Sequence, residues 1–301
     1  DISFAMSLAA ANVLVRCSGT KTGDRGSNWG IWTMNEFVEK DTPAGLRGTQ
    51  TLMRGLDILD QVIDGPVKLG DLAKGLELSK STTHRLAQAL RARDYLSATA
   101  DGYSLGPKLL QLGNMAHEQT DYVKIARPFM EELSARTSYC VFIGKREADW
   151  SRHLERVTGR QRLRVATAPG DTRYITDTGL GKALLLDENM ETLSRLLTAG
   201  RPDMKPAAQA AWLSAMAKQI ERGVVLHDSE AGDGVRSVAA PVRDAKGRIV
   251  IALSIAGAAH YLTDEVMADL VEPMRETAAA ISAELGYVER AHGEEAATAA
   301  A

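Results

Sequence analysis

The segment from Val67 to Gly106 constrains the fold more than any other part of the sequence. A short apolar helix pattern from Leu69 is followed by a break. A second helix is expected to begin after Ser79, whose hydroxyl can accept a hydrogen bond from a first-turn N–H. Beyond it, Asp101-Gly102 lies between two short β-prone runs, which is typical of a hairpin. This order of elements predicts a winged helix-turn-helix.

The second helix of this segment carries side chains suited to DNA. Four basic and no acidic residues lie between Ser79 and Arg93, whereas the whole chain has a formal net charge of −3. A basic surface on an acidic protein indicates a local contact with a polyanion. Ser, Thr, Lys and Arg at the start of such a helix can reach base edges and phosphates. We expect the residues that contact double-stranded DNA to be Arg54, Lys80, Ser81, Thr82, Thr83, His84, Arg85, Gln88, Arg91 and Tyr103.

Apolar spacing places two further helical faces in this region. The first helix is expected over 51–64, with an apolar face whose members are Leu52, Leu56, Leu59 and Ile63. The DNA-facing helix is expected to pack on the core through Leu86, Ala89 and Leu90. An ordinary helical hairpin with a charged outer face is the plainer alternative. The hairpin and the charge asymmetry favour DNA binding over it.

Composition limits the class of protein. A chain of 301 residues with 45% hydrophobic and 25% charged residues is typical of a globular protein with room for two domains. No apolar run reaches the roughly 18 residues of a membrane span. Cys17 and Cys140 form neither a disulfide framework nor a zinc motif, which fits a cytoplasmic location. The six histidines have no metal-ligand spacing, so we expect no metal, no cofactor and no catalytic residues.

The rest of the chain indicates a second domain. Strand patterns, including one over 163–167, alternate with helices and hairpins, which predicts an α+β domain around an antiparallel sheet. We expect a disordered extension over 1–45, with Met34 as the biological start, and a flexible tail over 289–301. Between them we expect a winged helix-turn-helix over 46–107, a linker helix over 108–122 that contributes a dimer contact, and an effector-binding domain over 123–288.

Four segments together resemble the IclR family of bacterial transcription regulators. They are LMRGLDILD at 52–60, LGDLAKGLELSKSTTHRLAQAL at 69–90, TGLGKALLL at 178–186 and GVRSVAAPVRDAKGRIVIALSIAG at 234–257. The resemblance implies a winged helix-turn-helix joined to a GAF-like α/β effector domain with a central antiparallel sheet. It also implies a homodimer or homotetramer on a palindromic operator, and a small organic or aromatic acid as effector.

The same resemblance implies an effector pocket. By position, the ligand-binding residues are Gly179, Leu180, His227, Ser237, Ser254 and Ala256. The family often has Cys at the position of Ser237, a carboxylate or other polar side chain at His227 and a second Ser at Ala256. This chain therefore lacks one hydroxyl and has an imidazole in the pocket. Apolar neighbours are expected at Leu163 and Val165.

Other chemistry is less well supported. The segment 176–183 lacks the first glycine and the final hydroxyl of a nucleotide-binding loop, so its glycines indicate either an anion-binding turn or a simple helix entry. Arg160, Arg162, Arg164 and Arg173 form either a solvated face or a carboxylate clamp. An enzyme built on the sensor-like domain is the second hypothesis. A pure interaction module is the third, and the basic helix disfavours it.

Overall fold

The computed structural model describes residues 49–229 and 232–288. The chain divides into two compact units, of which the first ends at Thr120 and the second begins at Asp121. The expected extension over 1–45, the start at Met34 and the tail over 289–301 lie outside the described residues.

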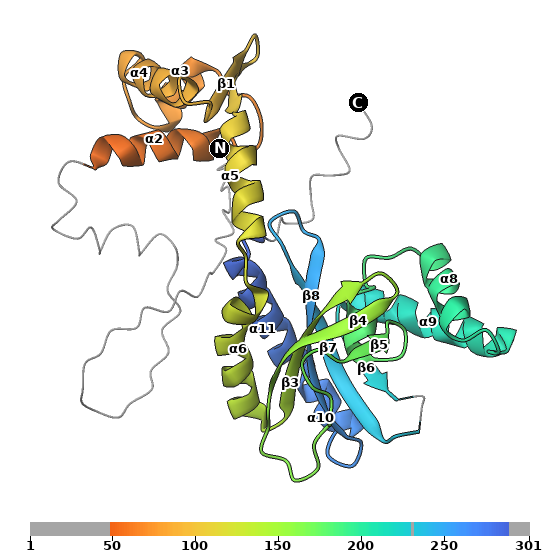
Figure 1. Cartoon of the computed structure of the whole chain (residues 1–301). Helices are drawn as coiled ribbons and strands as arrows, with labels where there is room; N and C mark the ends of the chain where they lie inside the picture. The colour runs from red at the N-terminus through yellow and green to blue at the C-terminus, as the bar shows by residue number, and fades with distance from the viewer. Residues whose placement is uncertain (1–48, 230–231, 289–301) are drawn as a thin grey trace, which may run out of the picture. The chain divides into compact units, whose positions relative to one another are not determined.

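The first unit is a winged helix-turn-helix, as the sequence predicts (Figure 1). Its elements are α2 (Gln50–Gln61), α3 (Leu69–Gly75), α4 (Lys80–Arg91), the antiparallel hairpin of β1 (Leu96–Thr99) and β2 (Gly102–Leu105), and α5 (Pro107–Glu118). Pro107 begins α5 because proline is preset for the first helical turn and has no N–H to leave unpaired. The core of the unit consists of Ile58, Val62, Leu72, Ala87, Leu96 and Tyr103.

The expected apolar faces of two helices in this unit are correct only in part, because Leu59 of α2 packs against the core but other members of that face do not. In α2, Ile58 is fully buried, whereas Leu52 and Leu56 are 62% and 45% exposed. The helix carries apolar residues on two faces, and periodicity alone does not say which one meets the core. In α4, Leu86 and Leu90 pack against the core as expected, beside the fully buried Ala87, whereas Ala89 is exposed.

The second unit is built around one six-stranded antiparallel sheet, which confirms the predicted α+β architecture. Its strand order is β5-β4-β3-β8-β7-β6. The bounds are β3 (Cys140–Glu147), β4 (Trp150–Val157), β5 (Thr172–Tyr174), β6 (Val225–Asp228), β7 (Val235–Arg243) and β8 (Ile249–Ala258). Gly247 has a φ of +76° in the turn between β7 and β8, a conformation that glycine adopts without steric cost.

Helices cover both faces of this sheet. One face carries α6 (Tyr122–Thr137), α10 (Asp264–Asp269) and α11 (Val271–Glu284), and the other carries α7 (Gly179–Ala183), α8 (Met190–Gly200) and α9 (Pro206–Arg222) (Figure 1). Alternation along each strand separates two cores. Val141 and Ile143 pack beneath α6 and α11, whereas Cys140 and Phe142 pack toward α7 and α8.

Two expectations for this unit are wrong. Residues 163–167 form no strand, although their alternating pattern resembles one, and β4 pairs instead with the short β5. The sequence pattern over 263–285 also predicts a single closing helix, but this stretch consists of α10 and α11, with Thr263 as the N-cap of α10. Both errors concern how segments pair and break, which depends on tertiary contacts more than on local pattern.

Candidate functional site

The DNA-facing helix α4 begins where the sequence predicts. Ser79 Oγ accepts a hydrogen bond from the N–H of Thr82 at 3.2 Å, which caps the helix. The hydroxyls of Ser81 and Thr82 lie 3.0 and 2.9 Å from the same Ser79 oxygen. The first turn of α4 therefore presents a group of hydroxyls beside its unpaired N–H groups, an arrangement suited to phosphate or base contacts.

Most of the expected DNA-binding residues have accessible side chains. Lys80, Ser81, His84, Arg85 and Arg91 are exposed, and Arg54, Thr82 and Gln88 are half-buried. None of the three cations on α4 forms an ion pair with a residue in the described ranges. Their charge is thus available to a polyanion, which is the electrostatic requirement of a nucleic-acid contact.

Two members of the expected DNA-binding set are corrected, because they lie in the core. Thr83 is fully buried, and its hydroxyl donates to the backbone oxygen of Ser79 at 3.1 Å. Tyr103 is 8% exposed, and its backbone pairs with Val67. Both side chains support the domain from within and do not present a surface to DNA.

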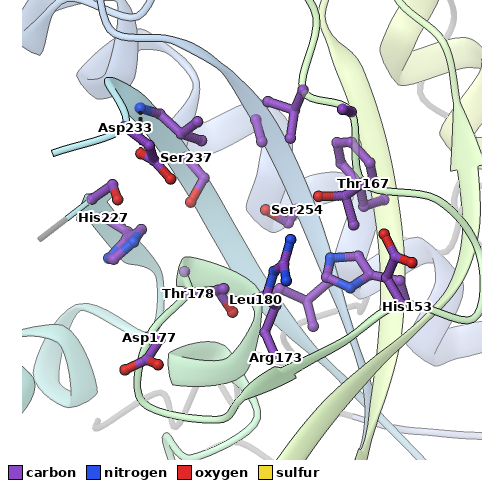
Figure 2. Close-up of a pocket in the computed structure, with 18 of the residues that line it drawn as sticks. His153, Thr167, Arg173, Asp177, Thr178, Leu180, His227, Asp233, Ser237 and Ser254 are labelled. Carbon is purple, nitrogen blue, oxygen red and sulfur yellow. Dashed lines mark hydrogen bonds between the residues drawn. The ribbon is translucent and has the colours of Figure 1, made fainter. Parts of the chain in front are cut away.

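A pocket of about 440 Å³ opens in the second unit, beside α7 and the sheet (Figure 2). All six residues expected to bind the effector line it: Gly179, Leu180, His227, Ser237, Ser254 and Ala256. Strand pairing brings three of them into one row, because His227 on β6 lies opposite Ser237 on β7, which lies opposite Ala256 on β8. Cross-strand partners share a face of the sheet, so these side chains converge although they are far apart in sequence.

The turn at α7 supplies backbone donors to this pocket. Thr178 Oγ1 accepts a hydrogen bond from the N–H of Gly181 at 3.0 Å and so caps the helix. The N–H groups of Gly179 and Leu180 have no hydrogen-bond partner in the part of the chain that the structure describes. Because α7 has only five residues, these two N–H groups are more important for an anion than the helix dipole.

Glycines make the close packing of this turn possible. A Cβ on Gly179 would lie 2.2 Å from Ser237 Oγ and 2.9 Å from the Cβ of His227. On β3, a Cβ on Gly144 would lie 2.8 Å from Leu180. The register of β3 against β4 shifts between Ile143 and Gly144, at the point where Leu180 packs against the sheet. Both glycines therefore set how near α7 comes to the strands.

Charged groups surround the pocket. Asp177 accepts two hydrogen bonds from Arg201, at 3.1 and 2.9 Å. Asp233 accepts one from the N–H of Val235 at 3.0 Å, and a hydrogen bond from Ser229 is the main cause that lowers its pKa. These two carboxylates are thus already engaged. Arg173 lines the pocket and forms no ion pair with a described residue.

The arginine cluster of 160–173 is divided by the structure. Arg164 and Arg173 line the pocket, whereas Arg160 and Arg162 are exposed and do not. The apolar neighbours also differ from expectation, because Val165 lines the pocket but Leu163 is 60% exposed. The reason is that 163–167 is an irregular segment rather than a strand, so its side chains do not alternate between sheet faces.

Among the pocket residues that sequence reasoning missed is His153 on β4. Its side chain is 7% exposed, and its ring meets Phe142 edge-on with centroids 5.7 Å apart. Burial lowers the pKa of His153, and the nearby Asp171 offsets part of that effect. A lone histidine within a strand gives no motif. Its position opposite Gly144, at the bulge, becomes visible only once β3 and β4 are paired.

The described residues contain neither a candidate metal cluster nor a candidate membrane-spanning helix. Within 49–229 and 232–288, no group of three or more His, Cys, Asp or Glu side chains is placed to hold a metal ion. In the same part of the chain, no helix has both the length and the apolar character that crossing a membrane requires.

Two family patterns match the chain. The IclR helix-turn-helix domain matches residues 51–99, and the bacterial transcriptional regulator IclR C-terminal domain matches residues 115–283. The DNA-binding transcriptional repressor YiaJ of Escherichia coli is 30% identical over 270 residues, covering 85% of this chain and 94% of that protein. The regulator XynR of the same organism is 29% identical over 246 residues, covering 79% and 98%.

Solved structures agree with these matches. The repressor BlcR of Agobacterium tumefaciens has a TM-score of 0.65 at 25% identity, covering 79% of this chain and 98% of that one. HmgR of Pseudomonas aeruginosa has a TM-score of 0.66 at 25% identity, covering 80% and 99%. The named relatives are transcription regulators and not enzymes. The chain belongs to the IclR family and is a DNA-binding transcription regulator.

Proposed function

We propose that a small organic acid controls operator binding by this regulator, with its carboxylate at the Gly179–Leu180 turn. The observation that carries the proposal is the pair of unpartnered N–H groups at this turn, which border a pocket beside Ser237. Backbone N–H groups that converge without a protein acceptor are suited to an anionic oxygen. Ser237, Ser254 and His227 would complete the polar contacts.

The rest of the pocket favours an apolar body on this acid. Leu180, Val165, Ala256 and Phe142 contribute apolar surface to the lining. Ala256 has no hydroxyl to offer, so the chain gives a ligand fewer hydrogen bonds here than a Ser would. A hydrocarbon or aromatic acid fits this chemistry better than a very small, highly polar acid.

On the DNA side, we propose that α4 enters the major groove of a palindromic operator. Base edges or phosphates would be contacted by Lys80, Ser81, His84 and Arg85. Arg54 and Arg91 would contact the sugar-phosphate backbone of the DNA. We also propose that the protein represses transcription, which the naming of YiaJ and AllR as repressors supports.

The binding of a palindrome requires two copies of the chain. In the first unit, Leu52 and Met53 on α2 and Leu110, Leu112 and Met115 on α5 are each more than 40% exposed. Large apolar residues on two helices of one small domain are typical of a surface that a partner covers. We propose a second copy of the chain as that partner. Light scattering of Leu110→Asp is expected to show a smaller assembly than wild type, and an unchanged mass would contradict the role of α5.

The proposed control by an acid can be tested directly. A thermal-shift screen over organic acids should find ligands that raise the melting temperature, because a ligand that binds only the folded state stabilises it. Each hit is then added to the protein bound to DNA from upstream of its own gene, and operator affinity is followed by fluorescence anisotropy. A hit that stabilises the protein but leaves operator affinity unchanged contradicts control by that acid. Recovery of the acid chemically unchanged separates a sensor from an enzyme.

Two variants locate the site. Ser254→Ala removes a hydroxyl from the pocket, and we expect at least tenfold weaker binding of a hit ligand, since a hydrogen bond to a charged group contributes about 1.5–3 kcal/mol. Ser214→Ala removes an exposed hydroxyl from α9, away from the pocket lining, and serves as the matched control. An equal change of ligand affinity in both variants would mean that the ligand does not bind in this pocket.

A further inference from the structure

The pocket has a second polar end that the proposed carboxylate site does not use. Figure 2 shows His227 and Ser237 on one side of the pocket and His153 and Thr167 on the other, with Ser254 between them. A ligand that only placed a carboxylate beside Gly179 would leave the His153 side without a polar contact.

His153 has few hydrogen bonds within the protein. Its Nδ1 atom is buried and has no partner at hydrogen-bond geometry among the described residues, although the backbone of Asp171 lies near enough to the ring to raise its pKa. The Nε2 atom forms no hydrogen bond with a described residue and is not closed off like Nδ1, so it is the ring atom that a ligand can reach. Polar groups inside folded proteins are nearly always hydrogen-bonded, so Nε2 is a position that a ligand atom can fill.

Asp171 and Arg173 bring opposite charges to this side of the pocket. Burial is the main cause that lowers the pKa of His153, Asp171 opposes it and Arg173 adds to it, so the neutral ring is favoured. Arg173 has donors directed at the same space and no carboxylate partner in 49–229 or 232–288. A neutral imidazole beside a guanidinium suits a neutral ligand group better than a second carboxylate, which would lie near Asp171.

We propose that His153 selects effectors that carry a hydroxyl group on the far side of their apolar body from the carboxylate. A hydroxyl both donates and accepts, so it can pair with Nε2 of His153 in either tautomer and still accept from Arg173. Phe142, edge-on to His153, would contact the apolar body between the two ends. This inference rests on the proposed function, because it takes the carboxylate end at Gly179 and Leu180 as given.

The test compares acids that differ only in the hydroxyl. Calorimetry measures the affinities of benzoate, 3-hydroxybenzoate, 4-hydroxybenzoate, phenylacetate and 4-hydroxyphenylacetate for the full chain. Wild type is expected to bind at least one hydroxylated acid about fivefold more tightly than its parent, the effect of one neutral hydrogen bond. If no hydroxylated acid exceeds its parent, or if no acid of the set binds, the inference is overturned.

Variants at His153 then assign the preference. His153→Phe keeps an aromatic ring beside Phe142 and removes both ring nitrogens, so it should abolish the preference while leaving the parent acid within about twofold. His153→Gln keeps a donor and an acceptor and should restore part of it. If His153→Phe weakens the binding of the hydroxylated acid and of its parent by the same factor, His153 has only a packing role and the inference is overturned. If His153→Phe does not fold, His153→Gln is used for the same comparison.

A variant at the other end keeps the two proposals separate. Ser237→Ala should weaken both members of a pair equally, because it acts on the carboxylate. If Ser237→Ala has no effect while His153→Phe removes the preference, the carboxylate site is wrong and the hydroxyl site stands. If Ser237→Ala weakens the binding of both acids while His153→Phe leaves the ratio of their affinities unchanged, the hydroxyl site is wrong and the carboxylate site stands.

Discussion

Lys182 Nζ lies 3.3 Å from Nδ1 of His227, and both side chains are buried. We expect the Lys182 ammonium group to donate to Nδ1 of His227, because an ammonium group has donors and no acceptor, and this leaves the ring proton on Nε2. Lys182 also lies over the ring of Trp212, 5.4 Å from its centroid, which holds the amine in place. Lys182 is outside the lining of the effector pocket, yet it sets the hydrogen-bonding role of a residue inside it.

The first prediction follows from this contact. In wild type, ¹⁵N NMR of histidine is expected to show His227 as the Nε2–H tautomer, and Lys182→Met should change it to a mixture of tautomers. The affinity for an effector should fall by up to about fivefold, because molecules with the other His227 tautomer lose one hydrogen bond to the ligand. Lys218→Met, which removes an exposed lysine on α9, is the control. Identical spectra of wild type and Lys182→Met would contradict the assignment.

The second prediction concerns pH and His153. Burial lowers the pKa of this ring from its ordinary value of 6.5. Well above pH 6.5 the ring is neutral in both the folded and the unfolded chain, so it contributes no pH dependence. As the pH falls through that value the unfolded chain takes up a proton that the folded pocket resists, so the free energy of unfolding falls with the pH.

Urea denaturation at pH 7.5 and 5.5 measures this loss. We expect His153→Phe to show a smaller difference between the two pH values than wild type. His117→Phe, at an exposed position on α5, should show the wild-type difference. An equal pH dependence in wild type and His153→Phe would mean that another group causes it.

The third prediction concerns Gly179. In Gly179→Ala, the new Cβ would lie 2.2 Å from Ser237 Oγ, so α7 or Ser237 must move. We expect the affinity for a hit ligand to fall at least tenfold because the two N–H donors are displaced. Gly113→Ala, on α5, meets no atom within 4 Å and should keep wild-type affinity. Calorimetry measures the ligand affinity of the three proteins. A wild-type affinity in Gly179→Ala would mean that this turn does not contact the ligand.

The fourth prediction concerns DNA. Both Arg85 and Arg93 are exposed, but Arg85 lies within α4 and Arg93 lies beyond its end. Arg85→Ala is expected to weaken operator binding by about 1–3 kcal/mol if it contacts a base, whereas Arg93→Ala should mainly lower the salt dependence by about one unit. Anisotropy at fixed salt measures the first effect and a salt series the second. Equal operator affinity of Arg85→Ala and wild type would exclude Arg85 from the interface.

Local signals predicted the elements of the fold well. Ser79 caps α4 and Asp101-Gly102 lies at the turn between β1 and β2, as expected, because each satisfies a backbone requirement that depends only on its neighbours. The face that each helix buries was less accessible to sequence reasoning. On α2, both Leu56 and Ile58 are apolar, and only the packing of the three helices decides that Ile58 is inside.

The pocket shows the same division. Its residues at the α7 turn and on β6 to β8 were predicted through the family resemblance. His153 was missed because nothing in its sequence neighbourhood indicates a ligand. Its place in the pocket depends on a bulge in β4, where Leu154 is the extra residue, and on the pairing of β4 with β3, both of which are tertiary features.

Alternation along β8 has a consequence for how this regulator can diversify. Leu253 and Ile255 pack in the core beneath α6 and α11, whereas Ser254 and Ala256 face the pocket. Substitutions at the pocket-facing positions would therefore alter the ligand that we propose for this pocket without changing the side chains beneath α6 and α11. Ligand preference could then diverge one side chain at a time while that core is kept.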